Sequence, residues 1–362
     1  MAYDFKKIVS NFKIDGEFIS CERYGEGHIN ETYLLSTSED GKTVQYILQK
    51  INDKLFPVDK LMSNIKLVTE FNRNKIIEKG GNPDREALSL VYTKTGDSYI
   101  KTDEGCFRVY IFITDAIAYQ ISPSAECFYE SAVAFGNFAN LLSEFDASSL
   151  YEVIPDFHNT EKRFRDFEAS LKADKMNRAS LVKEEIDFYL SRKDYCSKIV
   201  SLLRSKEMPT KVTHNDTKLN NVMLDAKTNK SVAVIDLDTI MPGSICYDFG
   251  DSIRFGCNTA SEDEKDLSKV NFSLELFEAY TKGYLSALNG NITKVEKDNL
   301  VYGAIIMTYE CGMRFLADYL DGDVYFRTHR EGHNLDRTRT QIKLVKDMEN
   351  CLDKMIEIVN KY

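Results

Sequence analysis

The spacing of apolar residues changes character near residue 113, and this change most restricts the fold. The segment before it contains short runs rich in aromatic and β-branched residues. These runs predict strands at 17–24, 31–37, 43–51 and 106–113. Apolar residues at helical spacing over 57–79 predict one amphipathic helix that crosses this sheet. In the segment after it, apolar residues recur every three to four positions. This spacing predicts helices at 128–145, 161–176, 183–205 and 343–362.

The sequence therefore predicts an α+β protein with two lobes. A small β-sheet lobe with one main helix would comprise residues 1–113, and a large, mainly helical lobe residues 114–362. Two short strand-like runs, 210–214 and 229–236, interrupt the helices. The cleft between two such lobes is a usual place for a ligand site.

Composition excludes several functional classes. The formal charge of −10 and the pI near 5.2 leave no basic stripe for nucleic acid or for an anionic membrane surface. The eight cysteines show neither C-x-x-C nor zinc-site spacing, so we expect reduced thiols. The first 16 residues lack the apolar core of a signal peptide, and no apolar run has membrane-spanning length. We expect a cytoplasmic protein and, at this size, a monomer.

The polar stretch VTHNDTKLNNVMLD, residues 212–225, interrupts two apolar runs. Asp216 and Asn221 lie five residues apart on one short loop. A carboxylate there can accept a proton from an attacking hydroxyl, and a carboxamide can offer its oxygen to a divalent metal. This is the division of labour in a kinase catalytic loop. A polar β-turn capped by Asn and Asp is the structural alternative.

A second acidic pair follows ten residues later in SVAVIDLDT, residues 231–239. A buried apolar strand that ends in Asp236 and Asp238 would aim two carboxylates toward the loop, which is how an oxygen-ligand site for Mg²⁺ is assembled. An exposed hairpin end is the alternative. Each motif alone is weak, but the two in this order favour phosphoryl transfer.

In the predicted small lobe, Gly25 and Gly27 lie in a turn between two strand-like runs, where backbone N–H groups can approach phosphate oxygens. The strand that carries the phosphate-pairing lysine in kinase-like folds has Gln49 at its inward position. Lys50 would face the other side of the sheet because strand side chains alternate. In kinase-like folds a glutamate on the following helix pairs with that lysine. Glu70 occupies the corresponding position here, and it fits a solvated surface carboxylate.

Three positions in the predicted helical lobe have structural or binding interpretations. Asp248 fits a residue of a capped helix that braces the polar loop. Arg314 has Asp318 four residues on, which suits either a surface ion pair or a partly buried arginine. Tyr325 lies in a segment without regular periodicity, the kind of element that lines pockets.

The order HNDTKLNN followed by IDLDT resembles the aminoglycoside-phosphotransferase-like kinases, whose pattern is H-x-D-x-x-x-x-N and then an apolar strand ending in Asp. Within that family, further blocks resemble the N-acetylhexosamine 1-kinases, including YGEGHINETYLL, YILQKIN, FRVYIFI, AFGNFANLLSEFDAS and ECGMRFLADYL. The resemblance covers almost the whole chain, from about residue 24 to 346.

The resemblance implies a role for each matching position. Asp216 would be the catalytic base, and Asn221 and Asp236 would bind Mg²⁺. Substrate-binding positions would be His28, Asp238, Phe255, Arg314 and Tyr325. Nucleotide-binding positions would be Gly25, Gly27, Gln49, and the hinge residues Tyr110, Ile111, Phe112 and Ile113.

The implied activity is transfer of phosphate from ATP to the anomeric hydroxyl of N-acetylglucosamine or N-acetylgalactosamine. The first lobe would then bind nucleotide, and the second would hold the catalytic loop and the sugar. Two alternatives remain open. One is a related kinase acting on an aminoglycoside, homoserine, choline or another sugar. The other is a non-catalytic nucleotide-binding protein, which the glutamine at position 49 suggests.

Overall fold

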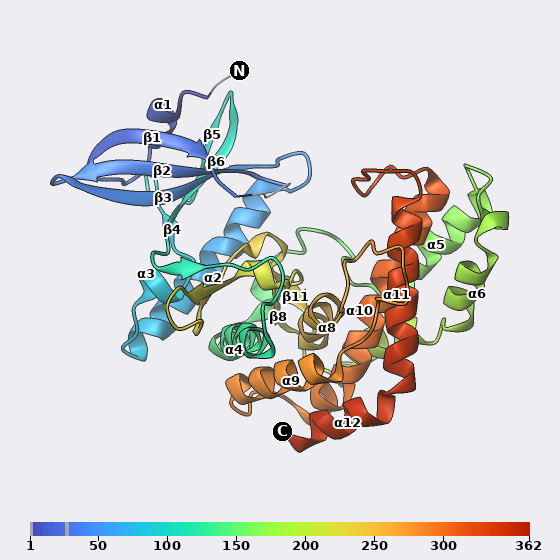
Figure 1. The fold of residues 1–362 in the computed structure, drawn as a ribbon. Helices are drawn as coiled ribbons and strands as arrows, with labels where there is room; N and C mark the ends of the chain where they lie inside the picture. Colours follow the sequence, from blue (N-terminus) through green and yellow to red (C-terminus); the bar gives the residue numbers. More distant parts are fainter. Residues whose placement is uncertain (1–2, 26–28) are drawn as a thin grey trace.

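The computed structural model describes residues 3–25 and 29–362. The chain forms a small lobe around an antiparallel sheet and a larger helical lobe (Figure 1), which confirms the predicted α+β two-lobed class. The sheet has the order β1-β2-β3-β6-β4, with β5 also paired to β6. Its strands are β1 Glu17–Arg23, β2 Glu31–Glu39, β3 Lys42–Ile51, β4 Leu90–Val91, β5 Ile100–Thr102 and β6 Gly105–Ile111.

The two faces of this sheet have different partners. Alternate side chains, among them Leu35, Leu48 and Val109, form a compact cluster with the short helix α1, Phe5–Val9. The opposite face carries Ile51 and Tyr110, which join the large core that continues into the helical lobe. One face thus closes the small lobe, and the other attaches it to the rest of the molecule.

Helix α2, Val58–Glu78, is the predicted helix of the small lobe. It starts after Pro57, whose fixed φ suits a helix start, and it buries Leu61, Ile65 and Val68 completely. Glu70 is exposed and accepts a hydrogen bond from the Tyr92 hydroxyl at 2.6 Å, which confirms the solvated carboxylate.

A buried asparagine on the apolar face of α2 ties the two lobes together. The Asn64 amide nitrogen donates to the carbonyl oxygens of Tyr151 and Ile240 at 2.8 and 2.9 Å. Its oxygen accepts the backbone N–H of Tyr151 at 2.9 Å. Through these three hydrogen bonds the buried asparagine fastens α2 to the second lobe.

The second lobe is mainly helical (Figure 1). Its helices, with the short α3 that precedes it, are α3 Pro83–Glu86, α4 Ala125–Leu141, α5 Thr160–Ala173, α6 Lys183–Ser191, α7 Tyr195–Arg204, α8 Ile245–Gly256, α9 Leu274–Leu288, α10 Lys294–Asp321, α11 His333–Asn350 and α12 Leu352–Lys361. The single helix predicted over 183–205 is wrong, because it is broken between α6 and α7. The helix predicted over 343–362 is likewise interrupted at Cys351, whose φ of −116° is not helical.

Two small sheets carry the polar loop. One has the order β10-β9-β7 and the other pairs β11 with β8. Their strands are β7 Ala116–Ile117, β8 Lys211–Thr213, β9 Val222–Asp225, β10 Ser231–Val234 and β11 Met241–Gly243. The two predicted strand runs thus correspond to β8 and β10, and the polar stretch connects β8 to β9.

The eight cysteines are all free thiols. None of the helices within 3–25 and 29–362 combines the length and the hydrophobicity that a membrane span needs.

Candidate active site

Asp216 lies on the loop between β8 and β9, with its side chain partly open to solvent. Its Oδ1 atom is 2.7 Å from the Lys218 ammonium. The Asn221 amide nitrogen donates to the Asp216 carbonyl oxygen at 2.8 Å and to Oδ2 at 3.2 Å. The structure therefore brings Asp216 and Asn221 together as the sequence predicted, and it adds Lys218 as a direct partner.

The first turn of helix α8 holds this loop in shape. Asp248 accepts the backbone N–H groups of His214 and Asn215 at 2.8 and 2.7 Å, which confirms the predicted brace. Asn215 has a φ of +64°, a left-handed conformation that asparagine tolerates better than most residues. The Thr217 hydroxyl donates to the Asp248 carbonyl oxygen at 2.6 Å. These buried contacts give the loop one conformation.

The next turn of α8 adds a charge cluster beneath the loop. Asp251 accepts the backbone N–H of Thr217 at 3.0 Å and lies 2.9 Å from an Arg254 guanidinium nitrogen. Burial alone would raise the pKa of Asp251, but the charges of Arg254 and Lys218 hold it below its usual range. Likewise, burial would lower the pKa of Lys218, but Asp216 and Asp251 raise it above its ordinary value. Lys218 therefore stays protonated beside Asp216.

Asp236 follows strand β10 and faces the loop. Its backbone is left-handed, with a φ of +61°, and the N–H of Ile235 donates to the Asn221 carbonyl oxygen at 2.9 Å. Solvent reaches the side chain, yet protein atoms surround it. This desolvation, with the carboxylates of Asp238 and Asp216, raises the pKa of Asp236 above its usual range.

The donor set around Asp236 suits a hard cation. Asn221 and Asp236 supply a carboxamide oxygen and a carboxylate, the ligands that Mg²⁺ prefers, and nucleotide-bound Mg²⁺ takes only one or two protein carboxylates besides phosphates and waters. Within the described residues, no group of three or more His, Cys, Asp or Glu side chains forms a metal cage. Two oxygen donors of this kind fit a cation whose remaining ligands are phosphates and waters.

Asp238 is buried in a contact that the sequence analysis did not foresee. Its Oδ1 atom lies 2.7 Å from Nη2 of Arg108, a strand β6 residue whose side chain is 1% exposed. The Asn30 amide nitrogen donates to Oδ2 of Asp238, and the Asn30 oxygen accepts the backbone N–H of Asn52 at 3.0 Å. The sequence does contain a sign of a buried ion pair at Arg108, because this arginine is the lone charged residue of the apolar run CFRVYIFI.

The strand alternation predicted at Gln49 and Lys50 is confirmed. Gln49 faces the second lobe and accepts two hydrogen bonds from Arg108, from Nε at 3.0 Å and Nη2 at 2.8 Å. Lys50 faces the other side and donates to the Tyr3 hydroxyl at 2.8 Å. The positive charge nearest to Gln49 therefore comes from the neighbouring strand, not from Lys50.

The predicted hinge residues lie at the end of β6 and directly after it. Tyr110 and Ile113 are buried, whereas Ile111 and Phe112 are half-buried. The ring of Phe112 packs edge-on against Tyr24 at a centroid distance of 6.0 Å. Gly25 has a φ of +71° with open space where a Cβ would lie, so the turn after β1 starts with a conformation that favours glycine. Gly27 and His28 lie outside the described residues.

Three of the predicted substrate-binding residues, Phe255, Arg314 and Tyr325, lie on α8, α10 and the loop after α10. Phe255 is half-buried on α8. The Arg314 guanidinium, on α10, lies within 6 Å of three aromatic rings, a cation–π distance: Phe157 at 5.8 Å, Tyr325 at 5.8 Å and Phe326 at 5.4 Å. Of the two alternatives for Arg314, the structure therefore favours the partly buried arginine.

Asp318 has a different partner, which sequence spacing could not identify. It accepts the consecutive backbone N–H groups of Val324, Tyr325 and Phe326 at 2.9, 2.8 and 3.0 Å. This buried carboxylate fixes the loop that carries Tyr325, whose side chain remains 67% exposed. The predicted irregular loop is confirmed, and Asp318 determines its shape.

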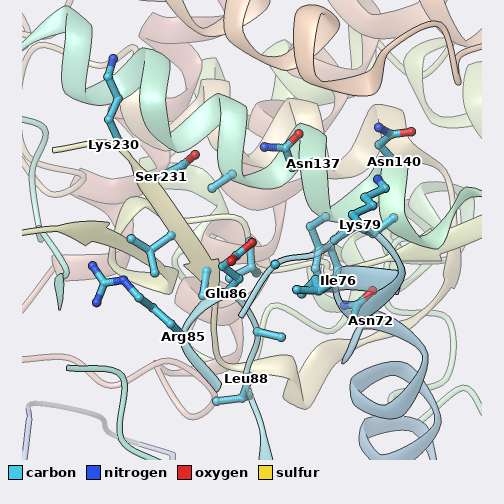
Figure 2. A pocket seen from close by; sticks show the side chains of 18 of the residues that line it. Asn72, Ile76, Lys79, Arg85, Glu86, Leu88, Asn137, Asn140, Lys230 and Ser231 are labelled. Atoms are coloured by element: carbon cyan, nitrogen blue, oxygen red, sulfur yellow. The ribbon is translucent and has the colours of Figure 1, made fainter. Parts of the chain in front are cut away.

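A separate cavity of about 530 Å³ lies between α2, α3, α4 and the β9–β10 hairpin. Figure 2 shows Asn137 and Asn140 on one wall and Asn72, Ile76 and Lys79 on the other. Asp216, Asn221 and Asp236 lie outside this lining. We therefore place the candidate active site at the polar loop and not in this cavity.

Comparison with known proteins identifies the family and the fold. A family model described as "Phosphotransferase enzyme family" matches residues 20–287. An aminoglycoside phosphotransferase from Alicyclobacillus acidocaldarius superposes with a TM-score of 0.64 at 14% identity, covering 98% of this chain and 96% of that one. A choline kinase from Cryptosporidium parvum gives a TM-score of 0.56 at 14% identity, with 99% and 98% covered.

A third solved structure was determined with a nucleotide. A spectinomycin phosphotransferase in complex with ADP and spectinomycin gives a TM-score of 0.51 at 15% identity, covering 98% of this chain and 96% of the other. At such low identities the three similarities establish the shared fold, and the acceptors named for them belong to those proteins.

Proposed function

Because the chain belongs to the phosphotransferase enzyme family, we propose that it is an ATP-dependent kinase that phosphorylates the anomeric hydroxyl of N-acetylhexosamines. The products are the sugar 1-phosphate and ADP. The acceptor is N-acetylglucosamine or N-acetylgalactosamine, as the sequence resemblance implies.

One observation carries the proposal: a partly exposed carboxylate, Asp216, is held rigidly beside Asn221 and close to Asp236. Phosphoryl transfer requires mostly positioning and charge stabilisation, because the transferring phosphoryl group needs little covalent help from the protein. A fixed base next to an oxygen-ligand pair supports this chemistry directly.

In the proposed reaction Asp216 accepts the proton of the 1-hydroxyl while that oxygen forms a bond to the γ-phosphorus of ATP. The bond from the γ-phosphorus to the β–γ bridging oxygen breaks, and ADP leaves with the electron pair. An anomeric hydroxyl is more acidic than an ordinary alcohol, which makes a carboxylate a suitable base. Lys218, 2.7 Å from Asp216, orients the base.

Asn221 and Asp236 would hold Mg²⁺, with Asp238 close by. When bound, the cation would neutralise phosphate charge. In this proposal the lobe of residues 1–113 binds the nucleotide, with adenine at the Tyr110–Ile113 hinge and phosphates near the Gly25–Gly27 turn. The lobe of residues 114–362 provides the base and the sugar site, with Phe255 and, from the turn, His28 next to the acceptor.

The character of the acceptor side supports a neutral sugar. Arg314 lies against three aromatic rings, and it lowers the pKa of the nearby Arg163 in addition to the effect of burial. Two neighbouring guanidinium groups repel a cationic acceptor such as an aminoglycoside or choline. Guanidinium groups and aromatic faces, in contrast, suit the hydroxyls and the apolar face of a pyranose ring.

An acceptor panel tests the proposal. The purified chain with Mg·ATP would be assayed for ADP release with N-acetylglucosamine, N-acetylgalactosamine, glucose, galactose, choline, homoserine and kanamycin. Phosphorus NMR of the product would identify the phosphorylated oxygen. We expect release with the two N-acetylhexosamines and an anomeric phosphate in the product. Turnover with a cationic acceptor alone would support a related kinase. The lack of turnover with every acceptor would support a non-catalytic protein.

A further inference from the structure

Gln49 and Arg108 lie directly opposite each other in the β3–β6 pair. Side chains at paired positions project to the same face, here the face toward the second lobe. The Gln49 oxygen accepts from two guanidinium nitrogens of Arg108, and its amide nitrogen donates to the Thr32 hydroxyl at 3.0 Å. The carboxamide therefore orients the guanidinium and is itself oriented by β2.

The other partner of Arg108 belongs to the second lobe. Asp238 Oδ1 is 2.7 Å from Nη2, and the two side chains are 1% and 7% exposed. Removing one partner of such a buried pair leaves an uncompensated charge. Burial opposes the charge of Arg108, but Asp238, Tyr110 and Asp236 together outweigh this effect and raise the pKa of the arginine. Arg108 thus stays charged, and its contact with Asp238 links the two lobes.

Asp238 lies two residues after Asp236, and the left-handed backbone of Asp236 joins them in one tight turn. A constraint on the Asp238 carboxylate is therefore also a constraint on the direction of the Asp236 carboxylate. Asn30 holds the second oxygen of Asp238 from the small lobe. Asp238 consequently has both oxygens engaged by residues of the first lobe.

We propose that Arg108 is a positioning residue for the metal–nucleotide site. From strand β6 it supplies the buried positive charge that kinase-like folds place on strand β3. It holds Asp238, and through it the Asp236 turn, at the distance from the first lobe that binding of Mg²⁺ with a nucleoside diphosphate requires. This inference rests on the proposed function, because it assigns Asp236 to that cation.

The test is equilibrium binding of ADP by calorimetry, once with excess Mg²⁺ and once with EDTA, in the absence of any sugar. We expect Arg108→Met to weaken Mg·ADP binding about 10–100-fold, the range seen when a residue that orients a metal ligand is removed. Binding of metal-free ADP should change much less. Arg108→Lys, which keeps the charge, should recover part of the loss.

Arg192→Met is the matched control. Arg192, directly after α6, makes a two-point ion pair with Glu349 on α11, through Nε at 2.8 Å and Nη2 at 2.9 Å, away from the loop. The Arg192→Met variant should bind ADP with unchanged affinity, both with Mg²⁺ and with EDTA. A purely structural role of Arg108 would lower the melting temperature and reduce both constants equally, and that outcome would overturn the inference.

Gln49→Met provides the same comparison if Arg108→Met does not fold. It removes the acceptor that orients Arg108 and leaves every charge in place. A loss confined to Mg·ADP supports the inference. An equal loss with and without metal would indicate a direct contact of Gln49 with phosphate, and it would overturn the inference. Unchanged binding constants would also overturn the inference. A wild-type protein that binds Mg·ADP but phosphorylates no sugar contradicts the proposed acceptor and not this inference.

Discussion

Asp248 accepts the backbone N–H of Asn215 at 2.7 Å, one residue before the candidate base. The bond joins the first turn of α8 to a loop residue in a left-handed conformation. The same carboxylate accepts the N–H of His214, and the His214 ring in turn contacts the carbonyl oxygen of Ile235 at 2.9 Å. One buried carboxylate thus connects the base loop with the strand end that leads to Asp236.

Replacing Asp248 by alanine should loosen this connection. Two buried N–H groups would lose their acceptor, at a cost of about 1–3 kcal/mol each, and kcat should fall together with the free energy of unfolding. Urea denaturation and the kinase assay would measure both. Asp266→Ala is the control, since the Asp266 carboxylate contacts only Ser268 and, at 3.9 Å, Lys269 among the described residues, on the exposed surface, and its loss should change neither quantity.

Asp216→Asn tests the candidate base itself. The variant keeps the size and one acceptor oxygen but cannot take a proton, so kcat should fall by about 10²–10⁴-fold. Mg·ADP affinity should stay close to wild type, because the proposed metal ligands are untouched. Single-turnover kinetics and calorimetry provide the two measurements. Retention of a near-normal rate would remove Asp216 from the proposed mechanism.

Asp318→Ala should affect the acceptor and not the nucleotide. Without the carboxylate, the N–H groups of residues 324–326 lose their common acceptor. We expect faster amide hydrogen exchange over 322–328 and a higher KM for the sugar, with unchanged Mg·ADP binding. Asp353→Ala, at an exposed position on α12, is the control. If exchange does not change, the loop is held by other contacts.

Glu310 should make stability depend on pH in the acid range. Burial would raise its pKa, but hydrogen bonds from His158 and Thr160 and the charge of Arg314 hold it below its usual range. A carboxylate with a depressed folded-state pKa stabilises the fold fully above the unfolded value, about 4.3. That stabilisation is lost as the pH falls through the lower folded-state value.

The free energy of unfolding should therefore decrease as the pH is lowered below about 4.3, the unfolded-state pKa. Glu310→Gln should show a shallower decrease, because its carboxamide does not titrate. Denaturant unfolding at a series of acidic pH values measures the slopes. Glu357→Gln, at an exposed position on α12, should keep the wild-type slope. Equal slopes in all three proteins would contradict the assignment.

Several features of this structure were predictable from local patterns. Strand alternation placed Gln49 toward the second lobe and Lys50 away from it, and helical periodicity identified α2 and α4. The proximity of Asp216 and Asn221 followed from their five-residue spacing on one loop. The break between α6 and α7 was not predictable, because apolar periodicity continues across it while a tertiary ion pair engages Arg192.

The sequence by itself determined the two-lobed α+β architecture, the polar loop and the acidic strand end, because these depend on periodicity and spacing within short segments. Only the tertiary structure decided which side chains meet across the lobes. Arg108 and Asp238 are separated by 130 positions, and Asn64 and Ile240 by 176. Such pairs form because burial forces each polar group to find a partner, and the folded chain alone determines which partner is within reach.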